Sequence, residues 1–271
     1  MGQLVHTLPG GKPVDGVTLL AGEIYLVRKK VRDQVEMYDV ITYRLQRRLT
    51  VPDAIWFTDM TSCEHNRCVY IGDGSGLCVH RLDVHGTVTR WYVSDSPRGL
   101  SLNAAHNVLV TCPWVRKIKE FSSHGDLLRE LTLPDDVIRL WHAIQTRSGQ
   151  FIVCHGRHDN PVHRVCMISA DGRHIVHSHG EKRGSDTGQY NEPRRLAVDD
   201  NESVFVADHY NRRVTLLTPT LEYVRQVVSR DQLKGKPWFL HLDTRQRLLY
   251  VADNRELDVG KWRGYLAVFS V

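Results

Sequence analysis

A short strand-like pattern recurs six times along the chain and constrains the fold more than any other feature. In each copy an aromatic or branched apolar pair precedes a small residue and then a polar one. The copies are residues 25–28, 70–73, 109–112, 151–154, 205–208 and 250–253. Their last residues lie between 39 and 54 positions apart. Six short-strand units at this period, with no long helical pattern, predict an all-β fold, the six-bladed β-propeller.

Further strand patterns surround each copy. Residues 196–198 alternate before the fifth copy, as residues 100–102 and 240–242 do before two others, which buries one face of each strand. A third strand and an outer strand follow most copies, so that each unit predicts a four-stranded blade. We place the units at approximately 10–52, 53–94, 95–134, 135–180, 188–230 and 235–271 of a single domain.

The sixth unit ends after its third strand, at residues 265–269. Residues 3–8 precede the first unit and also have strand character. We expect this N-terminal strand, within residues 1–9, to supply the missing outer strand of the sixth blade. Ring closure of this kind removes the edge that an open ring would expose.

Residues 184–214 carry the fullest copy of a recognisable signature. It combines a Gly-Gln-Tyr-Asn-Glu-Pro turn at 188–193, Val-Asp at 198–199, Val-Ala-Asp at 206–208 and Asn-Arg-Arg-Val at 211–214. This signature resembles the NHL repeat, and the chain resembles the six-bladed propeller that ends the TRIM-NHL proteins. The resemblance implies RNA binding on a basic propeller face. The RING, B-box, coiled-coil and filamin-like parts of those proteins are not in this sequence, so no ligase activity follows.

Basic and aromatic residues recur in loops that a propeller places on one face. Cations neutralise phosphates and aromatic rings stack on unpaired bases, which is the combination that single-stranded nucleic acid requires. We therefore predict a non-catalytic binding platform whose preferred partner is single-stranded RNA. The candidate RNA-binding residues are Arg98, Arg139, Arg194, Arg195, His209, Tyr210, Arg212, Arg213 and Trp238.

Several alternatives stay open for this face. The same residues suit a protein or peptide partner. Arg212 and Arg255 would instead hold loops if they pair with blade carboxylates such as Asp208 and Asp253. The rings of Trp141 and Trp238 would instead belong to the core if they pack between blades.

The fifteen histidines raise an enzymatic alternative, a metal-dependent lyase or hydrolase. Catalytic zinc needs three protein ligands and an open position. The spacing aligns His142 with Leu196 and puts His241 one position away, pointing in the other direction. A symmetric histidine triad is therefore not expected, and we predict neither a metal nor a cofactor. The alternative that remains uses His142 together with His155 or His241.

Cys112 and Cys154 occupy positions where other copies hold aspartate. A buried cysteine usually packs as a small apolar residue, whereas a thiol nucleophile beside His155 would need a base and an orienting group that the spacing does not provide. The Gly-rich segment 72–76 joins two strands, so we predict a turn and not a phosphate-binding loop, which would precede a helix.

Composition bears on the class of partner and on the cellular compartment. The net charge is +5, which is compatible with a polyanionic partner. The chain has no apolar run of about 18 residues, so we expect no transmembrane helix. The six cysteines form no C-x-x-C pair and no pattern typical of a disulfide framework. We therefore expect a reducing compartment, the cytoplasm.

Overall fold

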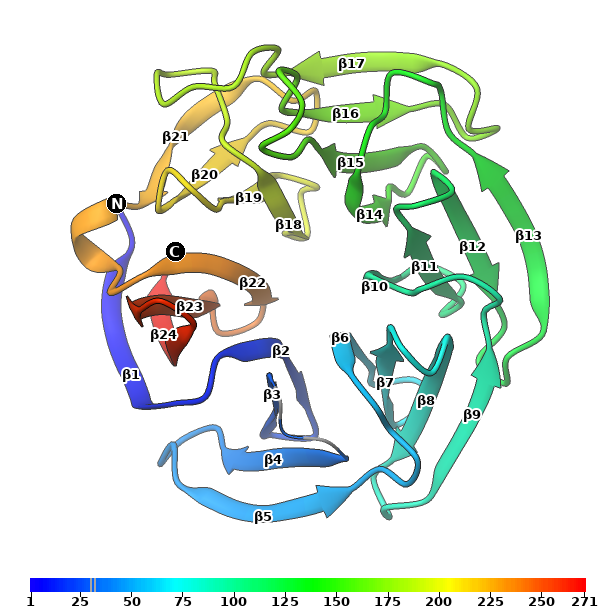
Figure 1. Cartoon of the computed structure of the whole chain (residues 1–271), viewed down its shortest axis with the longest axis vertical. Coiled ribbons are helices and arrows are strands. Elements are labelled where there is room, and N and C mark those ends of the chain that lie inside the picture. Colours follow the sequence, from blue (N-terminus) through cyan, green and yellow to red (C-terminus); the bar gives the residue numbers. More distant parts are fainter. Residues whose placement is uncertain (30, 32) are drawn as a thin grey trace.

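Six four-stranded antiparallel sheets form a ring around a central axis (Figure 1). The structure is a computed structural model that describes residues 1–29, 31 and 33–271. Within each sheet the strands run outward from the axis in chain order, apart from the sixth sheet. The six-bladed all-β propeller predicted from the repeat period is thus confirmed.

The first five sheets are each built from four consecutive strands. The first contains β2 (Val14–Leu20), β3 (Glu23–Arg28), β4 (Gln34–Asp39) and β5 (Leu45–Thr50). The second contains β6 (Phe57–Cys63), β7 (Cys68–Asp73), β8 (Cys78–Asp83) and β9 (Val88–Tyr92). The third contains β10 (Gly99–Leu102), β11 (Val108–Cys112), β12 (Lys117–Phe121) and β13 (Leu127–Thr132). The fourth contains β14 (Leu140–Gln145), β15 (Phe151–His155), β16 (Arg164–Ile168) and β17 (Ile175–His179). The fifth contains β18 (Pro193–Val198), β19 (Val204–Asp208), β20 (Arg213–Leu217) and β21 (Tyr223–Val228).

The sixth sheet joins the two ends of the chain. Its strands are β22 (Lys236–Asp243), β23 (Leu248–Asp258), β24 (Lys261–Ser270) and, outermost, β1 (Gln3–Gly11). β1 pairs antiparallel with β24, so that Leu8 lies opposite Leu266 (Figure 1). The expected closure by the N-terminal strand is therefore confirmed. A single 3-10 turn, η1 (Arg230–Gln232), leads into this sheet, and no described helix has the length and apolarity needed to cross a membrane.

Closure makes β1 part of the apolar core. Leu8 is 1% exposed and packs between the sixth and first sheets. We expect Leu8→Ala to lower the free energy of unfolding by about 2 kcal/mol, the low end for a buried leucine because an outer strand can relax around the cavity. Leu4 is 45% exposed on the same strand, so Leu4→Ala should cost less than about 0.5 kcal/mol. Denaturant unfolding of both variants measures these losses. Equal losses of stability would contradict the conclusion that β1 contributes to the core through Leu8.

The core is divided among the six contacts between neighbouring sheets. The buried apolar residues that the structure describes form six clusters, each shared by two adjacent sheets. Both faces of the second strand of each sheet are therefore covered. This explains why β11, β15 and β19 are buried along their whole length and show no polar alternation.

Candidate functional site

The innermost strands share an irregularity near their starts. In β2, β6, β14, β18 and β22 the pairing with the next strand skips one residue. In the third sheet Arg98 directly precedes Gly99, the first paired residue, and takes the corresponding place. A skipped residue forms a β-bulge, which changes the direction of its side chain. The residues at these six places are Asp15, Thr58, Arg98, Trp141, Arg194 and Trp238.

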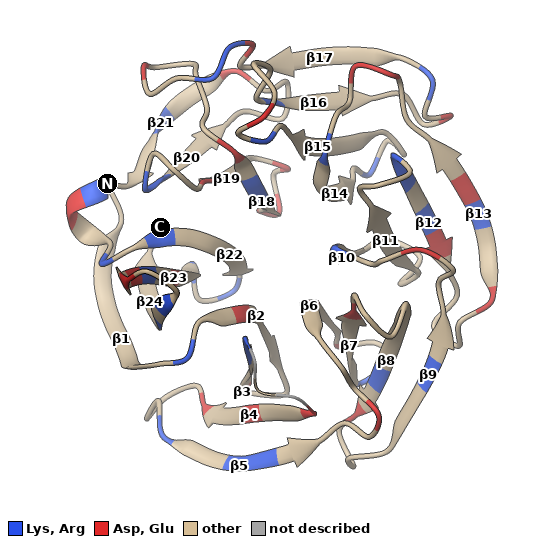
Figure 2. Ribbon diagram, viewed as in Figure 1, with Lys and Arg blue, Asp and Glu red and all other residues tan. Residues whose placement is uncertain are grey.

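The five bulge residues and Arg98 all line adjoining pockets at one mouth of the ring. The largest of these pockets has a volume of about 380 Å³ and also takes in loops that follow the second strands. We call it the basic–aromatic pocket. Its lining residues are Lys29, Trp56, Arg98, Pro113, Trp114, Arg139, Trp141, Arg157, His158, Arg194, Tyr210 and Trp238. Figure 2 shows Lys and Arg residues in β18 and beside β10. Arg194 of β18 and Arg98, which precedes β10, both line this pocket.

Cations and aromatic rings alternate within the basic–aromatic pocket. The guanidinium carbon of Arg98 lies 4.1 Å from the ring centre of Trp56. That of Arg139 lies 4.4 Å from the ring centre of Trp114. A guanidinium over an aromatic ring at this distance is attracted by the electron-rich ring face. Each pair holds an arginine side chain against an aromatic ring and so pre-organises both groups at the pocket wall.

Arg194 occupies the centre of the pocket between two tryptophans. Its guanidinium carbon lies 4.0 Å from the ring centre of Trp238 and 4.6 Å from that of Trp141. It donates to the buried carboxylate of Glu192 at 2.6 Å. Burial lowers the pKa of Arg194, while the charge of Glu192 and its hydrogen bond act in the opposite direction. Arg194 is thus a cation held by Glu192 and in contact with both tryptophan rings.

The pocket carries more positive than negative charge. Five of its lining residues are lysine or arginine. Glu192 is paired with Arg194, and the exposed carboxylate of Asp159 lies 3.9 Å from Arg139. The adjoining pocket contributes one buried acid, Asp15. Burial raises the pKa of Asp15 to about 7, against the opposing charges of Lys29 and Arg98.

The raised pKa of Asp15 predicts a pH dependence of stability. Between pH 3.8 and about 7 the folded protein holds this proton and the unfolded chain does not, so stability from this group falls as pH rises through that window. The wild type should therefore lose stability relative to Asp15→Asn as pH rises. The difference in free energy of unfolding between the two proteins should change by roughly 1–3 kcal/mol, in favour of the variant, between pH 5 and pH 8. Urea unfolding of both proteins at the two pH values measures the difference. Parallel pH profiles would show that Asp15 titrates normally.

Below the pocket, a salt bridge closes the channel. Arg195 from β18 pairs with Asp59 from β6, on the opposite side of the ring. Both side chains are buried. The Asp59 carboxylate also accepts the backbone N–H of Leu100, and Arg195 donates to the carbonyl oxygen of Leu100 at 3.3 Å. The channel is therefore tied across its centre by a charged pair and is not an open pore at this level.

The structure separates the nine candidate RNA-binding residues into two groups. Arg98, Arg139, Arg194, Tyr210 and Trp238 line the basic–aromatic pocket. The other four do not line it, although His209 and Arg195 line the adjoining pockets. They are Arg195 in the channel, His209, which is buried against the carbonyl of Pro237, Arg212, which donates to the carbonyls of Gly235 and Leu233, and Arg213, which pairs with Asp208.

Six pocket residues were not predicted for this face by the sequence analysis, namely Lys29, Trp56, Pro113, Trp114, Arg157 and His158. Trp56 immediately precedes the innermost strand of its sheet, the same place that drew attention to Arg139 in the fourth. Trp114 follows the second strand, as Tyr210 does in the fifth sheet. Comparing equivalent loops in all six units would have found both.

The alignment of the fourth unit was wrong by one residue. The bulge at Trp141 places His142 opposite Cys154, as Arg195 lies opposite Ala207. His142 thus matches Arg195 and not Leu196. His241 lies two positions beyond Phe239, the residue that matches His142, so it faces the same side and not the opposite one.

These histidines do not form a catalytic group in the described part of the chain. The Nε2 atom of His142 contacts the carbonyl oxygen of Leu100 at 3.0 Å, and the Nε2 atom of His155 contacts Arg164 and Cys166. Burial lowers the pKa of His155 to about 3 and that of His241 to about 4. Burial also raises the pKa of the Cys154 thiol to about 12, which keeps it protonated and not nucleophilic.

Comparison with known proteins defines the architecture. No protein-family model and no curated protein matches the sequence. Among solved structures, virginiamycin B lyase from Staphylococcus aureus is 10% identical over 98% of this chain and 100% of that chain, with a TM-score of 0.66. The β-propeller domain of Cps50 (Swd1) from Myceliophteria thermophila is 11% identical over 100% of both chains, with a TM-score of 0.64.

These likenesses establish the propeller fold. At such low identity they establish the fold alone. One of these structures is a lyase and the other is the propeller domain of Cps50 (Swd1), so the shared architecture does not select a function. The function must be argued from the pocket.

Proposed function

We propose that the protein is a non-catalytic platform that binds single-stranded RNA in the basic–aromatic pocket. One observation carries the proposal: five cations alternate with five aromatic rings in a single pocket of about 380 Å³. Phosphates pair with cations, and unstacked bases stack on aromatic or guanidinium planes. Arg98 and Arg139 contribute both kinds of surface, because each guanidinium already lies over a ring.

We further propose that the chain is an NHL-type propeller. The signature residues of its fifth unit have a structural role that fits a repeat. Asp208 accepts hydrogen bonds from the side chain of Asn211 and from Arg213, both at 2.8 Å. Arg213 also donates to the carbonyl of Gln189 at 2.7 Å. This network ties the turn before β18 to the loop after β19, so the signature serves the fold and leaves ligand binding to the bulge residues.

A salt series with fluorescently labelled oligouridine and oligoadenylate tests the proposal by anisotropy. Each phosphate neutralised on a single strand lowers the slope of log affinity against log salt by about 0.7. Three to five contacts should give a slope of roughly −2 to −4. Absent binding at low salt would contradict the proposal. Affinity that does not change with salt would point instead to a partner held by uncharged contacts, such as a peptide.

A further inference from the structure

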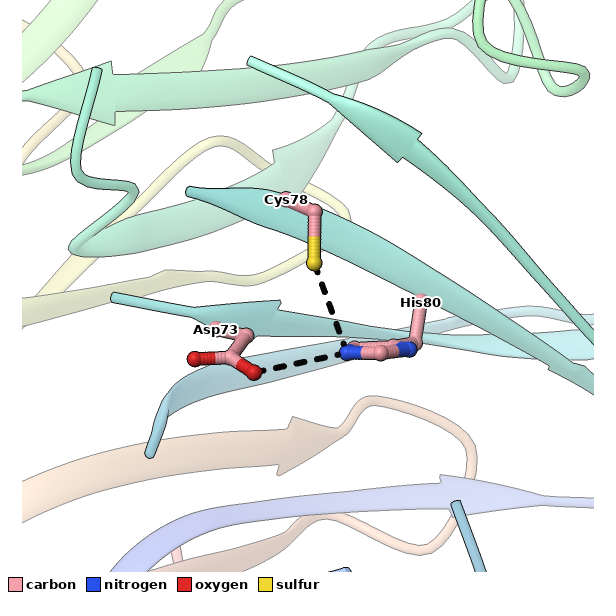
Figure 3. A group of neighbouring side chains, drawn as sticks. All are labelled: Asp73, Cys78 and His80. Atoms are coloured by element: carbon pink, nitrogen blue, oxygen red, sulfur yellow. Dashed lines mark hydrogen bonds and ion pairs between the residues drawn. The ribbon is translucent and has the colours of Figure 1, made fainter. Parts of the chain in front are cut away.

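Three buried side chains of the second sheet converge on one point. Asp73 ends β7, and Cys78 and His80 come from the start of β8 (Figure 3). The Nε2 atom of His80 lies 3.4 Å from the Cys78 sulfur and 3.5 Å from the Asp73 Oδ2 atom. All three ligand atoms lie within 4.8 Å of one another. No other group of three such ligands occurs among residues 1–29, 31 and 33–271.

The geometry suits a metal ion better than a hydrogen-bonded triad. Cys78 and Asp73 both approach the same nitrogen of His80, and its Nδ1 has no hydrogen-bond partner in the described structure. A single N–H cannot serve both neighbours well, whereas a cation in its place contacts all three. Zinc bonds of about 2.0–2.3 Å at tetrahedral angles put nitrogen and sulfur about 3.5 Å apart and nitrogen and oxygen about 3.4 Å apart. The observed separations are close to both values.

The surroundings orient the carboxylate and leave room beside it. The Oδ1 atom of Asp73 accepts the backbone N–H of Gly76 at 2.8 Å, and Oδ2 accepts that of Ile55 at 2.7 Å. Hydrogen bonds of this kind fix ligating carboxylates in metal sites. A Cβ atom at Gly76 would come within 2.7 Å of Oδ2 and 3.2 Å of the Cys78 sulfur. The glycine therefore keeps open the side on which a fourth ligand would lie.

The equivalent position in the fifth sheet shows what the second sheet lacks. In the fifth sheet Asp208 and Arg213 match Asp73 and Cys78 by register, and the arginine neutralises the aspartate at 2.8 Å. Among the described residues, Asp73 instead faces His80, a side chain that is positively charged only when it is protonated. A divalent cation would supply the positive charge that arginine provides in the fifth sheet.

We propose that Asp73, Cys78 and His80 bind a zinc ion. The ion joins the hairpin between β7 and β8 to the loop that carries Trp56, because Asp73 also accepts the backbone N–H of Trp56 at 3.1 Å. Zinc binding therefore stabilises one wall of the basic–aromatic pocket. Nothing in this proposal depends on the identity of the ligand that the pocket takes.

Cobalt substitution tests the site in the whole chain. Co²⁺ added to metal-stripped protein should give thiolate-to-cobalt charge-transfer absorption that saturates near about one equivalent, and added Zn²⁺ should abolish it. Cys78→Ser should remove this absorption, and His80→Gln should weaken cobalt binding at least about tenfold. Zinc should also raise the thermal midpoint of the wild type and leave that of Cys78→Ser unchanged.

Cys166→Ser is the matched control. Cys166 lies 3.5 Å from the Nε2 atom of His155, a contact like that of Cys78 with His80, but Arg164 donates to the same nitrogen at 3.0 Å. The fourth sheet thus offers a buried Cys–His pair with a cation already in place. Cys166→Ser should keep the full cobalt absorption. No absorption in the wild type, or absorption that survives Cys78→Ser, would overturn the proposal.

Discussion

Replacing Arg195 with methionine is expected to lower the free energy of unfolding by about 3–5 kcal/mol. The substitution leaves Asp59 as a buried charge without its partner, in the centre of the ring where water does not compensate it. It also removes a donor to the carbonyl of Leu100. Burial already raises the pKa of Asp59 to about 6 even with Arg195 present, which shows how poorly this site solvates a carboxylate.

A double variant separates the charge from the packing. Asp59→Asn keeps an acceptor for the backbone N–H of Leu100 and removes the buried charge. Combined with Arg195→Met, it should recover most of the stability that the single variant loses, because breaking one half of a buried pair costs more than replacing both halves. Arg173→Met is the surface control, since that side chain is 79% exposed and should change stability by less than about 0.5 kcal/mol.

Denaturant unfolding is measured for five proteins: the wild type, Arg195→Met, Asp59→Asn, the double variant and Arg173→Met. A loss for Arg195→Met no larger than that of Arg173→Met would mean that the pair across the channel contributes nothing to the fold. An additive double variant would mean that Asp59 and Arg195 act independently. The same data are needed to interpret RNA-binding experiments. If the Arg195 variant is unfolded, its loss of RNA binding does not show that Arg195 contacts the ligand.

The fold could be predicted from the sequence because its determinants recur. Six copies of one strand pattern predict six sheets, and the strand pattern of residues 3–8 predicts β1, which completes the sixth sheet. The fourth unit was misaligned for a physical reason. Residues 151–155 form a run buried throughout, and His155 stands where Asp208 marks the end of the fifth copy. Without an aspartate at the end of the strand, the hydrophobic pattern alone does not decide between two alignments of this unit that differ by one residue.

The pocket could be predicted only in outline for a related reason. Arg194 and Arg195 are neighbours in sequence and look equivalent there. A bulge at Arg194 turns it into the pocket, and regular pairing from Arg195 onward sends that residue into the channel. Bulges depend on the partner strand as well as on the local sequence. The convergence of Asp73, Cys78 and His80 was missed likewise, because the glycine-rich turn between them reads as a simple hairpin.

Reversing charge in the basic–aromatic pocket is expected to weaken RNA binding by about tenfold or more and to flatten its salt dependence. The variant Arg139→Glu/Arg157→Glu changes two lining residues without removing a buried partner, since the contact of Arg139 with Asp159 is exposed and 3.9 Å long. Each lost phosphate contact should make the slope of log affinity against log salt less negative by about 0.7. Anisotropy titrations over a salt series measure both quantities.

Two further variants locate and dissect the interaction. Arg147→Glu/Arg245→Glu makes the same change of charge on the turns after β14 and β22, at the opposite ends of the inner strands from the pocket, and should leave affinity nearly unchanged. Trp114→Ala should lose about 1–3 kcal/mol of binding, the range for one stacked base, with no change in slope. Trp114 is 56% exposed, so its loss should not unfold the protein. Equal weakening by both charge-reversal pairs would mean that the whole basic protein attracts RNA, and the pocket would no longer be the binding site.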